Sequence, residues 1–333
     1  MHKSIPQVTV LMSVFNDQGY LREAIESILN QSFRDFEFLI IDDGSTVSFN
    51  RIVAEYRDPR IVMMRHDNIG LTRSLNRGLR AAAGAYIARM DADDVSLPTR
   101  LETQLQEFDR NPRLDLVGTF FDVVDANGKL LERKTLITDP IYRLWRLQFH
   151  NNYGHGSVMV RKQALLDLGG YDERLPYAQD YDLWSRLSQK HNTSVIAEPL
   201  YQYRLVRNSS QASVRNYDAQ LAAAIGISNR NVMACNPRLT EVQAAEVRSL
   251  YWEFQFTEVP RSGYERVGET LVGFCRCFGV AGAERDALVA RVAQDLRNKV
   301  EEAKNMASAE KQKLLNLLRM DFRSFFGDGF ILA

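Results

Sequence analysis

Two hydrophobic periods alternate along the first hundred residues, and this alternation constrains the fold more than any other feature of the chain. Near-continuous apolar runs, which are typical of strands buried on both faces, occupy Val8 to Phe15, Phe36 to Ile41 and Ala85 to Met90. Between these runs apolar residues recur at helical spacing, as they do from Tyr20 to Leu29. Strands that alternate with helices form a mostly parallel sheet flanked by helices, so we predict an α/β fold for this part of the chain.

The pattern changes twice along the rest of the chain. From Leu114 to about Arg215 shorter strands, loops and two helices replace the regular alternation, and beyond Arg215 the sequence is rich in Ala, Glu and Arg at helical spacing. We therefore expect one α/β domain in two halves, residues 1–110 and 111–215, followed by a helical C-terminal region over residues 216–333.

Charge and cysteine content exclude several classes of protein. Lys plus Arg and Asp plus Glu each number 42, so the chain has no basic excess for binding nucleic acid. The chain has three cysteines, Cys235, Cys275 and Cys277, which are too few for the disulfide framework of a secreted domain. No zinc-binding spacing accompanies them. The start of the sequence lacks a signal-peptide pattern, and no stretch approaches the roughly 18 to 20 apolar residues that span a bilayer. We expect a cytoplasmic protein.

The last segment, Leu314 to Ala333, mixes leucine and phenylalanine with Arg319 and Arg323. A packed terminal helix and a helix that lies on a membrane surface both fit this pattern. The second would give the protein a peripheral contact with the inner face of the membrane.

Acidic residues follow two of the predicted strands. Asp91-Ala92-Asp93 follows the strand that ends at Met90, and Asp42-Asp43-Gly44-Ser45-Thr46 follows the strand that ends at Ile41. The carboxyl ends of parallel strands form a crevice where ligands bind, because the strand order reverses there. Two carboxylates one residue apart can approach one hard cation and leave positions for phosphate oxygens. The sequence therefore predicts a Mg²⁺ or Mn²⁺ site at Asp91 and Asp93.

The cluster at Asp42 and Asp43 allows two interpretations. Ser45 or Thr46 can cap a helix, with the aspartates favoured by the positive end of that helix. A carboxylate there can also accept the imide N–H of uracil or thymine, because a carboxylate only accepts hydrogen bonds. The residues alone leave both interpretations open.

Asp180 and His155 are further candidates in the second half. Asp180 begins a predicted helix behind a loop, where it can cap the helix or act as the general base that takes a proton from a hydroxyl. His155 lies in a glycine-flanked loop, where it is either structural or in contact with a substrate.

In order and spacing, these motifs resemble the family 2 glycosyltransferases of the GT-A fold over roughly residues 5–215. The nearest likeness is to bacterial enzymes that build capsule, exopolysaccharide or lipopolysaccharide O-chains. The blocks that carry the resemblance are Val8 to Asn16, Asp42 to Thr46, Asn68 to Leu71, Ser74 to Leu79, Gly84 to Asp94, His155 to Met159, Gly169 to Glu173 and Gln179 to Trp184.

The resemblance implies an inverting transfer of a sugar from a UDP- or dTDP-sugar to an acceptor hydroxyl, assisted by Mn²⁺ or Mg²⁺. Residues 1–110 would bind the nucleotide sugar, and residues 111–215 a carbohydrate or lipid-linked oligosaccharide acceptor. The implied roles are nucleotide contacts at Ser13, Phe15, Asp43 and Asp91, a metal ligand at Asp93, the general base at Asp180, and possible substrate contacts at His155, Gln179, Trp184 and Arg207.

The sequence departs from the family pattern at two positions. Gln179 stands where many relatives carry Glu, and Arg207 lies in a motif where many relatives carry His. An arginine does not ligate a metal, but it binds phosphate in a bidentate manner.

Two other functions stay open. Asp91 to Val95 also fits the motif of haloacid-dehalogenase-like phosphatases, although that motif normally closes the first strand. A sugar-nucleotide-binding protein without turnover is the second alternative.

Overall fold

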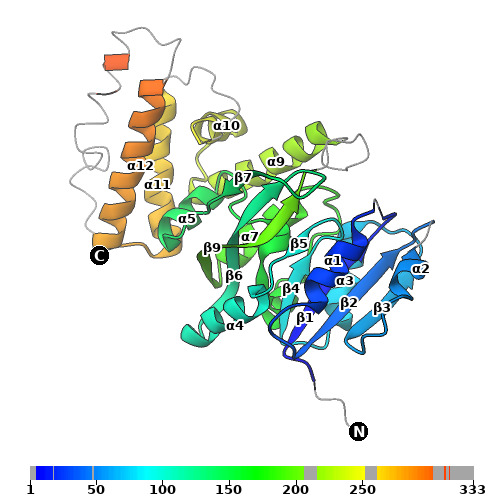
Figure 1. Ribbon diagram of the computed structural model, residues 1–333. Helices are drawn as coiled ribbons and strands as arrows, with labels where there is room; N and C mark the ends of the chain where they lie inside the picture. Colours follow the sequence, from blue (N-terminus) through cyan, green and yellow to red (C-terminus); the bar gives the residue numbers. More distant parts are fainter. Residues whose placement is uncertain are drawn as a thin grey trace. The chain divides into compact units, whose positions relative to one another are not determined.

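The computed structural model describes residues 5–17, 19–46, 49–205, 216–251, 261–302, 311, 312 and 315. The chain forms two compact units, one from residues 1–138 and 151–223 and the other from residues 139–150 and 224–333. Figure 1 shows the elements of both units. Arg207, a predicted substrate contact, lies outside the described residues. So do residues 316–333, which belong to the segment with the expected membrane-surface contact.

The first unit is built on a nine-stranded sheet, in which eight strands follow the order β3-β2-β1-β4-β8-β6-β9-β5 and the ninth, β7, pairs with β6. The ladders among β1, β2, β3 and β4 are all parallel, and most ladders among the later strands are antiparallel. The predicted α/β fold is confirmed. The strands are β1 (Val8–Val14), β2 (Phe36–Asp43), β3 (Ile61–His66), β4 (Tyr86–Met90), β5 (Val95–Ser96), β6 (Leu114–Val124), β7 (Leu130–Lys134), β8 (Met159–Arg161) and β9 (Asn192–Arg204).

Helices cover the sheet because each presents an apolar stripe to it. On one face α1 packs Leu21, Ile25 and Ile28 against the alternate β1 residues Val10 and Met12. On the other face α3 approaches the sheet closely at Gly78, where an added Cβ would lie 2.4 Å from Leu11 Cδ1. The helices of this unit are α1 (Leu21–Leu29), α2 (Phe49–Val53), α3 (Leu71–Ala81), α4 (Arg100–Arg110), the 3-10 helix η1 (His155–Ser157), α6 (Lys162–Asp167) and α7 (Gln179–Ser188).

Strand β9 is the longest element that the sequence patterns do not indicate. It contains Pro199, and a proline removes a donor from a ladder and argues against a strand. In the structure Pro199 lies opposite Phe120, where the register between β6 and β9 shifts, so the irregularity accommodates the proline.

The second unit is helical in its described residues. Its α5 comes from the middle of the chain and begins with Asp139, whose carboxylate accepts the Tyr142 N–H at 2.7 Å, followed by Pro140 in the first turn. Aromatic rings form part of its core, with Phe149 stacked on Tyr251 at a centroid distance of 4.2 Å. The helices that lie wholly or mainly in this unit are α5 (Pro140–Leu147), α9 (Tyr217–Cys235), α10 (Glu241–Ser249), α11 (Arg261–Phe278) and α12 (Gly282–Glu302). Among the described helices of both units, none has the length and apolarity to cross a bilayer.

Replacement of Gly84 tests the close packing of β4 on β1. An added Cβ at Gly84 would lie 2.4 Å from Thr9 N and 2.5 Å from Val8 C, and these backbone atoms cannot rotate away. We expect Gly84→Ala to lower the free energy of unfolding by about 1–3 kcal/mol in urea titrations. Gly226→Ala, with nothing within 4 Å of its added Cβ, is the control and should be neutral or stabilising. Equal stability of the Gly84→Ala variant and the parent protein would refute the tight packing.

Candidate active site

The carboxyl ends of β1, β2 and β4 meet at one edge of the sheet. Parallel pairing sets Val14 opposite Asp42 and Met12 opposite Met90, so the loops that follow these three strands leave the sheet side by side. The acidic clusters at Asp43 and at Asp91 therefore lie at the same edge, as the sequence predicts.

The loops after β1 and β2 are joined by Asn16. The N–H of Asn16 donates to Ser45 Oγ at 3.0 Å, and its Oδ1 accepts the N–H of Thr46 at 3.0 Å. Asn16 has a φ of 53°, in the left-handed region that asparagine tolerates. Beside it the Phe15 side chain is 53% exposed, whereas Ser13 is partly buried. This part of the edge thus presents an uncovered aromatic ring.

Asp43 holds the loop that leads into α3. Its Oδ1 accepts the N–H of Ile69 at 2.8 Å, its Oδ2 accepts the N–H of Gly70 at 3.0 Å, and His66 Nδ1 lies 3.3 Å from Oδ1. The side chain is only 3% exposed. The carboxylate therefore stabilises the amino end of α3, a helix later in the chain than the one that the capping interpretation considers.

A buried ion pair marks the end of β4. The guanidinium of Arg89 is 3% exposed, and its Nη1 pairs with Oδ1 of Asp91, which is 31% exposed. Burial alone would lower the pKa of Arg89, but the Asp91 carboxylate raises it above its ordinary value. Asp91 is thus held on one side by a permanent cation and is open to solvent on the other.

Asp94 ties the turn after β4 to β9. Its buried carboxylate accepts the Tyr201 hydroxyl at 2.7 Å and the Arg204 N–H at 2.8 Å, and the Tyr201 oxygen accepts the Asp91 N–H at 3.1 Å. Burial, with Asp91 and Asp93 nearby, raises the pKa of Asp94 well above its usual range. Gly156 is required beside this link, because an added Cβ would lie 2.0 Å from the Tyr201 oxygen.

Arg204 fixes the same turn from the end of β9. Its Nε donates to the Asp93 carbonyl at 2.9 Å, its Nη2 donates to Glu23 Oε2 at 2.6 Å, and its guanidinium lies 4.6 Å from the centroid of the Tyr20 ring. The backbone that presents Asp93 is therefore bonded to α1 and β9 together.

Asp180 lies in the first turn of α7. Its Oδ2 accepts the side-chain N–H of Asn151 at 2.8 Å, and its carboxylate also accepts the N–H of Tyr181. Burial raises the pKa of Asp180, while the nearby Arg89 opposes that rise and Asp91 adds to it. Ala178 precedes the helix with a φ of 53°, a conformation that costs a non-glycine residue about 1–3 kcal/mol. Such strain is typical of functional sites.

His155 belongs to an aromatic cluster with Tyr171 and Trp184. Its Nε2 lies 2.9 Å from the Tyr171 hydroxyl, and its ring lies 6.3 Å from that of Trp184. Burial, with Arg89 nearby, lowers the pKa of His155 well below its usual range, so the imidazole is neutral at pH 7. Trp184 is 1% exposed and Gln179 is buried, so both lie beneath the surface of the protein.

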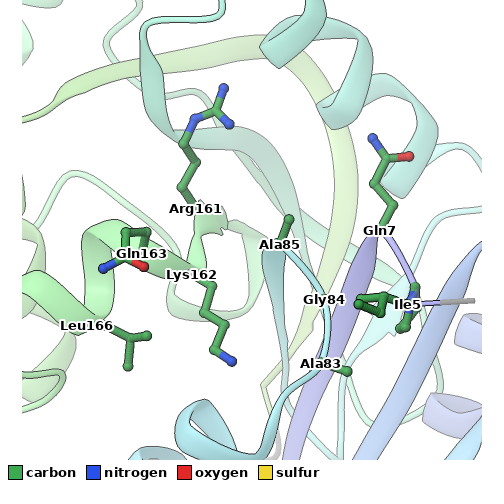
Figure 2. Close-up of a pocket in the computed structure, with 10 residues that line it drawn as sticks. Ile5, Gln7, Ala83, Gly84, Ala85, Arg161, Lys162, Gln163 and Leu166 are labelled. Carbon is green, nitrogen blue, oxygen red and sulfur yellow. The ribbon is translucent and has the colours of Figure 1, made fainter.

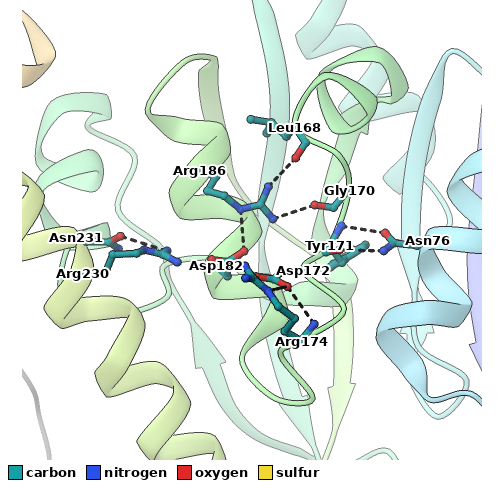
Figure 3. Close-up of polar contacts among 10 residues, drawn as sticks. All are labelled: Asn76, Leu168, Gly170, Tyr171, Asp172, Arg174, Asp182, Arg186, Arg230 and Asn231. Carbon is teal, nitrogen blue, oxygen red and sulfur yellow. Dashed lines mark hydrogen bonds and ion pairs between the residues drawn. The ribbon is translucent and has the colours of Figure 1, made fainter.

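Two helices hold the loop that carries Tyr171 (Figure 3). Asn76 of α3 accepts the Tyr171 N–H and donates to its carbonyl, both at 2.9 Å. Arg186 of α7 donates to the carbonyls of Leu168 and Gly170 at 3.0 and 2.9 Å and pairs with Asp182 at 2.8 Å. Tyr171 is thereby fixed against His155.

A cavity of about 570 Å³ lies at the other end of the strands (Figure 2). Gln7, before β1, and Ala85, before β4, line it, together with Arg161 and Lys162. Its lining contains no acidic side chain. It therefore lies apart from the acidic edge.

Within the described part of the chain, no group of three or more His, Cys, Asp or Glu side chains is placed to bind one ion. Asp91, which is partly exposed, and Asp93, in the same turn, supply two carboxylates, and Mg²⁺ is commonly bound by one or two carboxylates that share the ion with substrate phosphates and water.

Sequence reasoning assigns no role to Arg89, Asn151, Tyr171, Tyr201 or Arg204, yet all five contact the predicted site residues or their backbone. Arg89 carries a signal in the sequence, because a charged residue interrupts an otherwise apolar strand, and Tyr171 lies in the block Gly169 to Glu173 of the resemblance. The partners from β9 could not be found without the strand pairing.

Known proteins resemble this chain in sequence. Residues 9–168 match the family described as glycosyl transferase family 2. An uncharacterized glycosyltransferase of Methanocaldococcus jannaschii is 34% identical over 215 residues, which cover 62% of this chain and 74% of the relative. The O-antigen biosynthesis glycosyltransferase WbnJ of Escherichia coli is 33% identical over 220 residues, which cover 64% of this chain and 85% of the relative.

Solved structures share the fold. S. aureus TarS 1–349 in complex with UDP-GlcNAc aligns with a TM-score of 0.57 and 17% identity over 96% of this chain and 92% of that chain. The mannosyltransferase PcManGT from Pyrobaculum calidifontis, in complex with GDP-Man and Mn²⁺, aligns with a TM-score of 0.51 and 13% identity over 96% of this chain and 86% of that chain. The expected GT-A fold is thereby confirmed.

Replacement of Tyr201 tests the link between Asp91 and Asp94. Tyr201→Phe removes a hydroxyl that both accepts and donates in a buried position, and it leaves the Asp91 N–H and an Asp94 oxygen without that partner. We expect the free energy of unfolding to fall by about 1–3 kcal/mol in denaturant titrations. The control is Tyr56→Phe, which removes an exposed hydroxyl that donates to Glu26. This variant should change the free energy of unfolding by under about 0.5 kcal/mol. Equal effects of the two changes would contradict a structural role for the link.

Proposed function

Since this chain belongs to glycosyl transferase family 2, we propose that it transfers a sugar from a UDP- or dTDP-sugar to an acceptor hydroxyl, with inversion at the anomeric carbon. The observation that carries this proposal is the meeting of two acidic loops at the carboxyl ends of β1, β2 and β4, where Asp43 binds the N–H groups of Ile69 and Gly70 and Asp91 pairs with the buried Arg89. A single displacement further needs a base for the acceptor hydroxyl, and the Asp180 carboxylate, bound by Asn151, is the candidate.

The nucleotide is proposed to bind at the edge formed by β1 and β2. The exposed Phe15 ring offers a face for the base, and Ser13 borders it. Asp43 orders the loop at Ile69 and Gly70, and a carboxylate has lone pairs enough to accept an imide N–H in addition. Asp91, partly open to solvent, is proposed to contact the ribose.

Asp93 is proposed to hold Mn²⁺ or Mg²⁺ together with oxygens of the donor diphosphate. Such an ion stabilises the negative charge that develops on the departing diphosphate. The links from Arg204 and Tyr201 to the turn after β4 support this role, because they fix the backbone on which Asp93 stands. The Mn²⁺ in the PcManGT complex adds support by fold likeness.

Asp180 is proposed as the general base. The acceptor oxygen forms a bond to the anomeric carbon as the bond from that carbon to the diphosphate breaks, and the proton of the hydroxyl passes to Asp180. Asn151 binds one carboxylate oxygen and so orients the other. Gln179, His155 and Trp184 would line or support the substrate region, and Arg207 would bind a phosphate of the substrate.

The biological acceptor is proposed to be a carbohydrate or a lipid-linked oligosaccharide in cell-surface polysaccharide synthesis. The likeness to an O-antigen biosynthesis enzyme supports this class. A cytoplasmic location, with a peripheral membrane contact through the C-terminal segment, accompanies this proposal.

The described residues favour neither alternative function. The Asp91 motif follows the fourth strand along the chain, and Asp91 is paired with a buried arginine, which is unlike a nucleophile that closes the first strand. A binding protein without turnover would have no use for a carboxylate that Asn151 positions at Asp180, two residues after the strained backbone of Ala178.

Asp180→Asn tests the proposed reaction. A panel of UDP- and dTDP-sugars with candidate acceptors, read by mass spectrometry, first identifies the donor that the parent protein uses. With that donor, the variant should transfer at least about 10²-fold more slowly, because the positioned base is lost, while UDP affinity stays within a few-fold.

The matched control is Asp172→Asn, which removes a carboxylate paired with the exposed Arg174. It should leave turnover close to that of the parent protein. Unchanged turnover in Asp180→Asn would remove this residue from the mechanism, and a parent protein that binds UDP yet consumes no donor would support the non-catalytic alternative.

A further inference from the structure

The cavity at the amino ends of β1 and β4 takes no part in the proposed reaction (Figure 2). Its volume of about 570 Å³ is within the roughly 300–1,000 Å³ range of sites that bind small molecules. Apolar side chains form much of its lining, and two of them face solvent, since Ile5 is 79% exposed and Leu166 is 39% exposed. An apolar hollow is therefore open to solvent at this end of the sheet.

The backbone beside the cavity is already hydrogen-bonded. The N–H of Gly84 donates to Thr9 Oγ1 at 2.8 Å, and the N–H of Ala83 donates to Glu37 Oε1 at 2.5 Å. The same oxygen of Glu37, which does not line the cavity, also accepts the Thr9 hydroxyl at 2.5 Å. Polar contacts with a ligand would therefore come from the side chains of the lining.

Two cations border the cavity, and they differ in the donors that they have left. All three guanidinium nitrogens of Arg161 donate within the protein, to the Leu114 carbonyl, the Tyr86 hydroxyl and the Pro112 carbonyl. The ammonium of Lys162 has three N–H donors, and within the described residues its hydrogen bond is to the Ala82 carbonyl alone. Figure 2 shows the Arg161 and Lys162 side chains pointing in opposite directions, with Lys162 directed toward Ala83. Lys162 is thus the cation that a ligand would meet.

We propose that this cavity binds a small soluble anion with an apolar body. The apolar part would lie against Ile5 and Leu166, and the anionic group would accept the remaining N–H donors of Lys162. Because the lining contains a cation with donors to spare and no acidic side chain, its charge complements an anion. A concave site of this volume encloses a small molecule, which favours such a ligand over a flat surface of lipid or protein.

The test is methyl NMR spectroscopy of the full chain, because the Ile5, Ala83 and Leu166 methyl groups report binding at the cavity itself. Naphthalene-2-sulfonate is the probe, since it joins a rigid apolar ring system to a permanent anion. We expect the three methyl signals to shift together in a saturable titration, with a Kd of about 1 mM or below. Naphthalene-2-methanol, which lacks the charge, and methanesulfonate, which lacks the rings, should each bind at least about tenfold more weakly.

Substitutions at Lys162 test the role of its charge. Lys162→Met keeps the length of the side chain and removes the cation, so it should raise the Kd of naphthalene-2-sulfonate by about tenfold or more. Lys162→Arg keeps the cation and should stay within a few-fold of the parent protein. Lys190→Met, which removes an exposed lysine just after α7, is the matched control and should leave the Kd unchanged. If Lys162→Met does not fold, Leu166→Gln takes its place, because it removes part of the apolar wall and should also raise the Kd.

Three results would overturn the inference. The first is that the Ile5 and Leu166 signals stay in place throughout the titration. The second is that Lys162→Met and Lys190→Met bind the probe equally well, or that the neutral naphthalene binds as tightly as the sulfonate. The third is that vesicles of phosphatidylglycerol shift these signals while naphthalene-2-sulfonate does not, since the cavity would then belong to a membrane-contacting surface.

Discussion

The charge of Arg89 inside the sheet is the constraint on which the arrangement of the site depends. A guanidinium on the central strand β4 requires a carboxylate close by, and Asp91, two residues later, provides it. In the turn that follows, Asp93 is partly exposed and Asp94 is buried. The three aspartates after β4 thus have different surroundings: Asp91 pairs with the buried Arg89, Asp93 is partly exposed, and Asp94 lies in the interior.

Strand β9 supplies further partners for the turn after β4. The Tyr201 hydroxyl joins the Asp91 N–H to the Asp94 carboxylate, and Arg204 bonds the Asp93 carbonyl. These contacts join residues more than a hundred positions apart in sequence, so the turn after β4 gains these partners only when β9 is in place. The aromatic cluster depends equally on distant contacts, since Asn76 of α3 binds the backbone of Tyr171, and the Tyr171 hydroxyl contacts His155.

Local patterns predicted what depends on local chemistry. The α/β fold, the parallel strands that lead to Asp43 and Asp91, and the helix that begins near Asp180 all follow from hydrophobic periods and turn residues. The partners of the site residues could not be predicted in this way. Tyr201 and Arg204 lie on β9, whose Pro199 argues against a strand when only the sequence is known. Asp43 accepts its backbone hydrogen bonds from the loop before α3, a helix later in the chain. Such pairings depend on the register and order of strands, which a single sequence does not reveal.

The central claim is that carboxylates from distant parts of the chain share one site, with Asp93 toward a metal-bound diphosphate and Asp180 toward the acceptor. The most direct measurement is an anomalous-difference map, recorded at the manganese edge, from crystals grown with UDP and Mn²⁺. The account predicts a single manganese peak coordinated by Asp93 and diphosphate oxygens, with the Asp180 carboxylate unligated and facing the side of the diphosphate where the sugar would stand. A peak remote from Asp93, or a nucleotide bound where Asp180 cannot face its diphosphate, would contradict it.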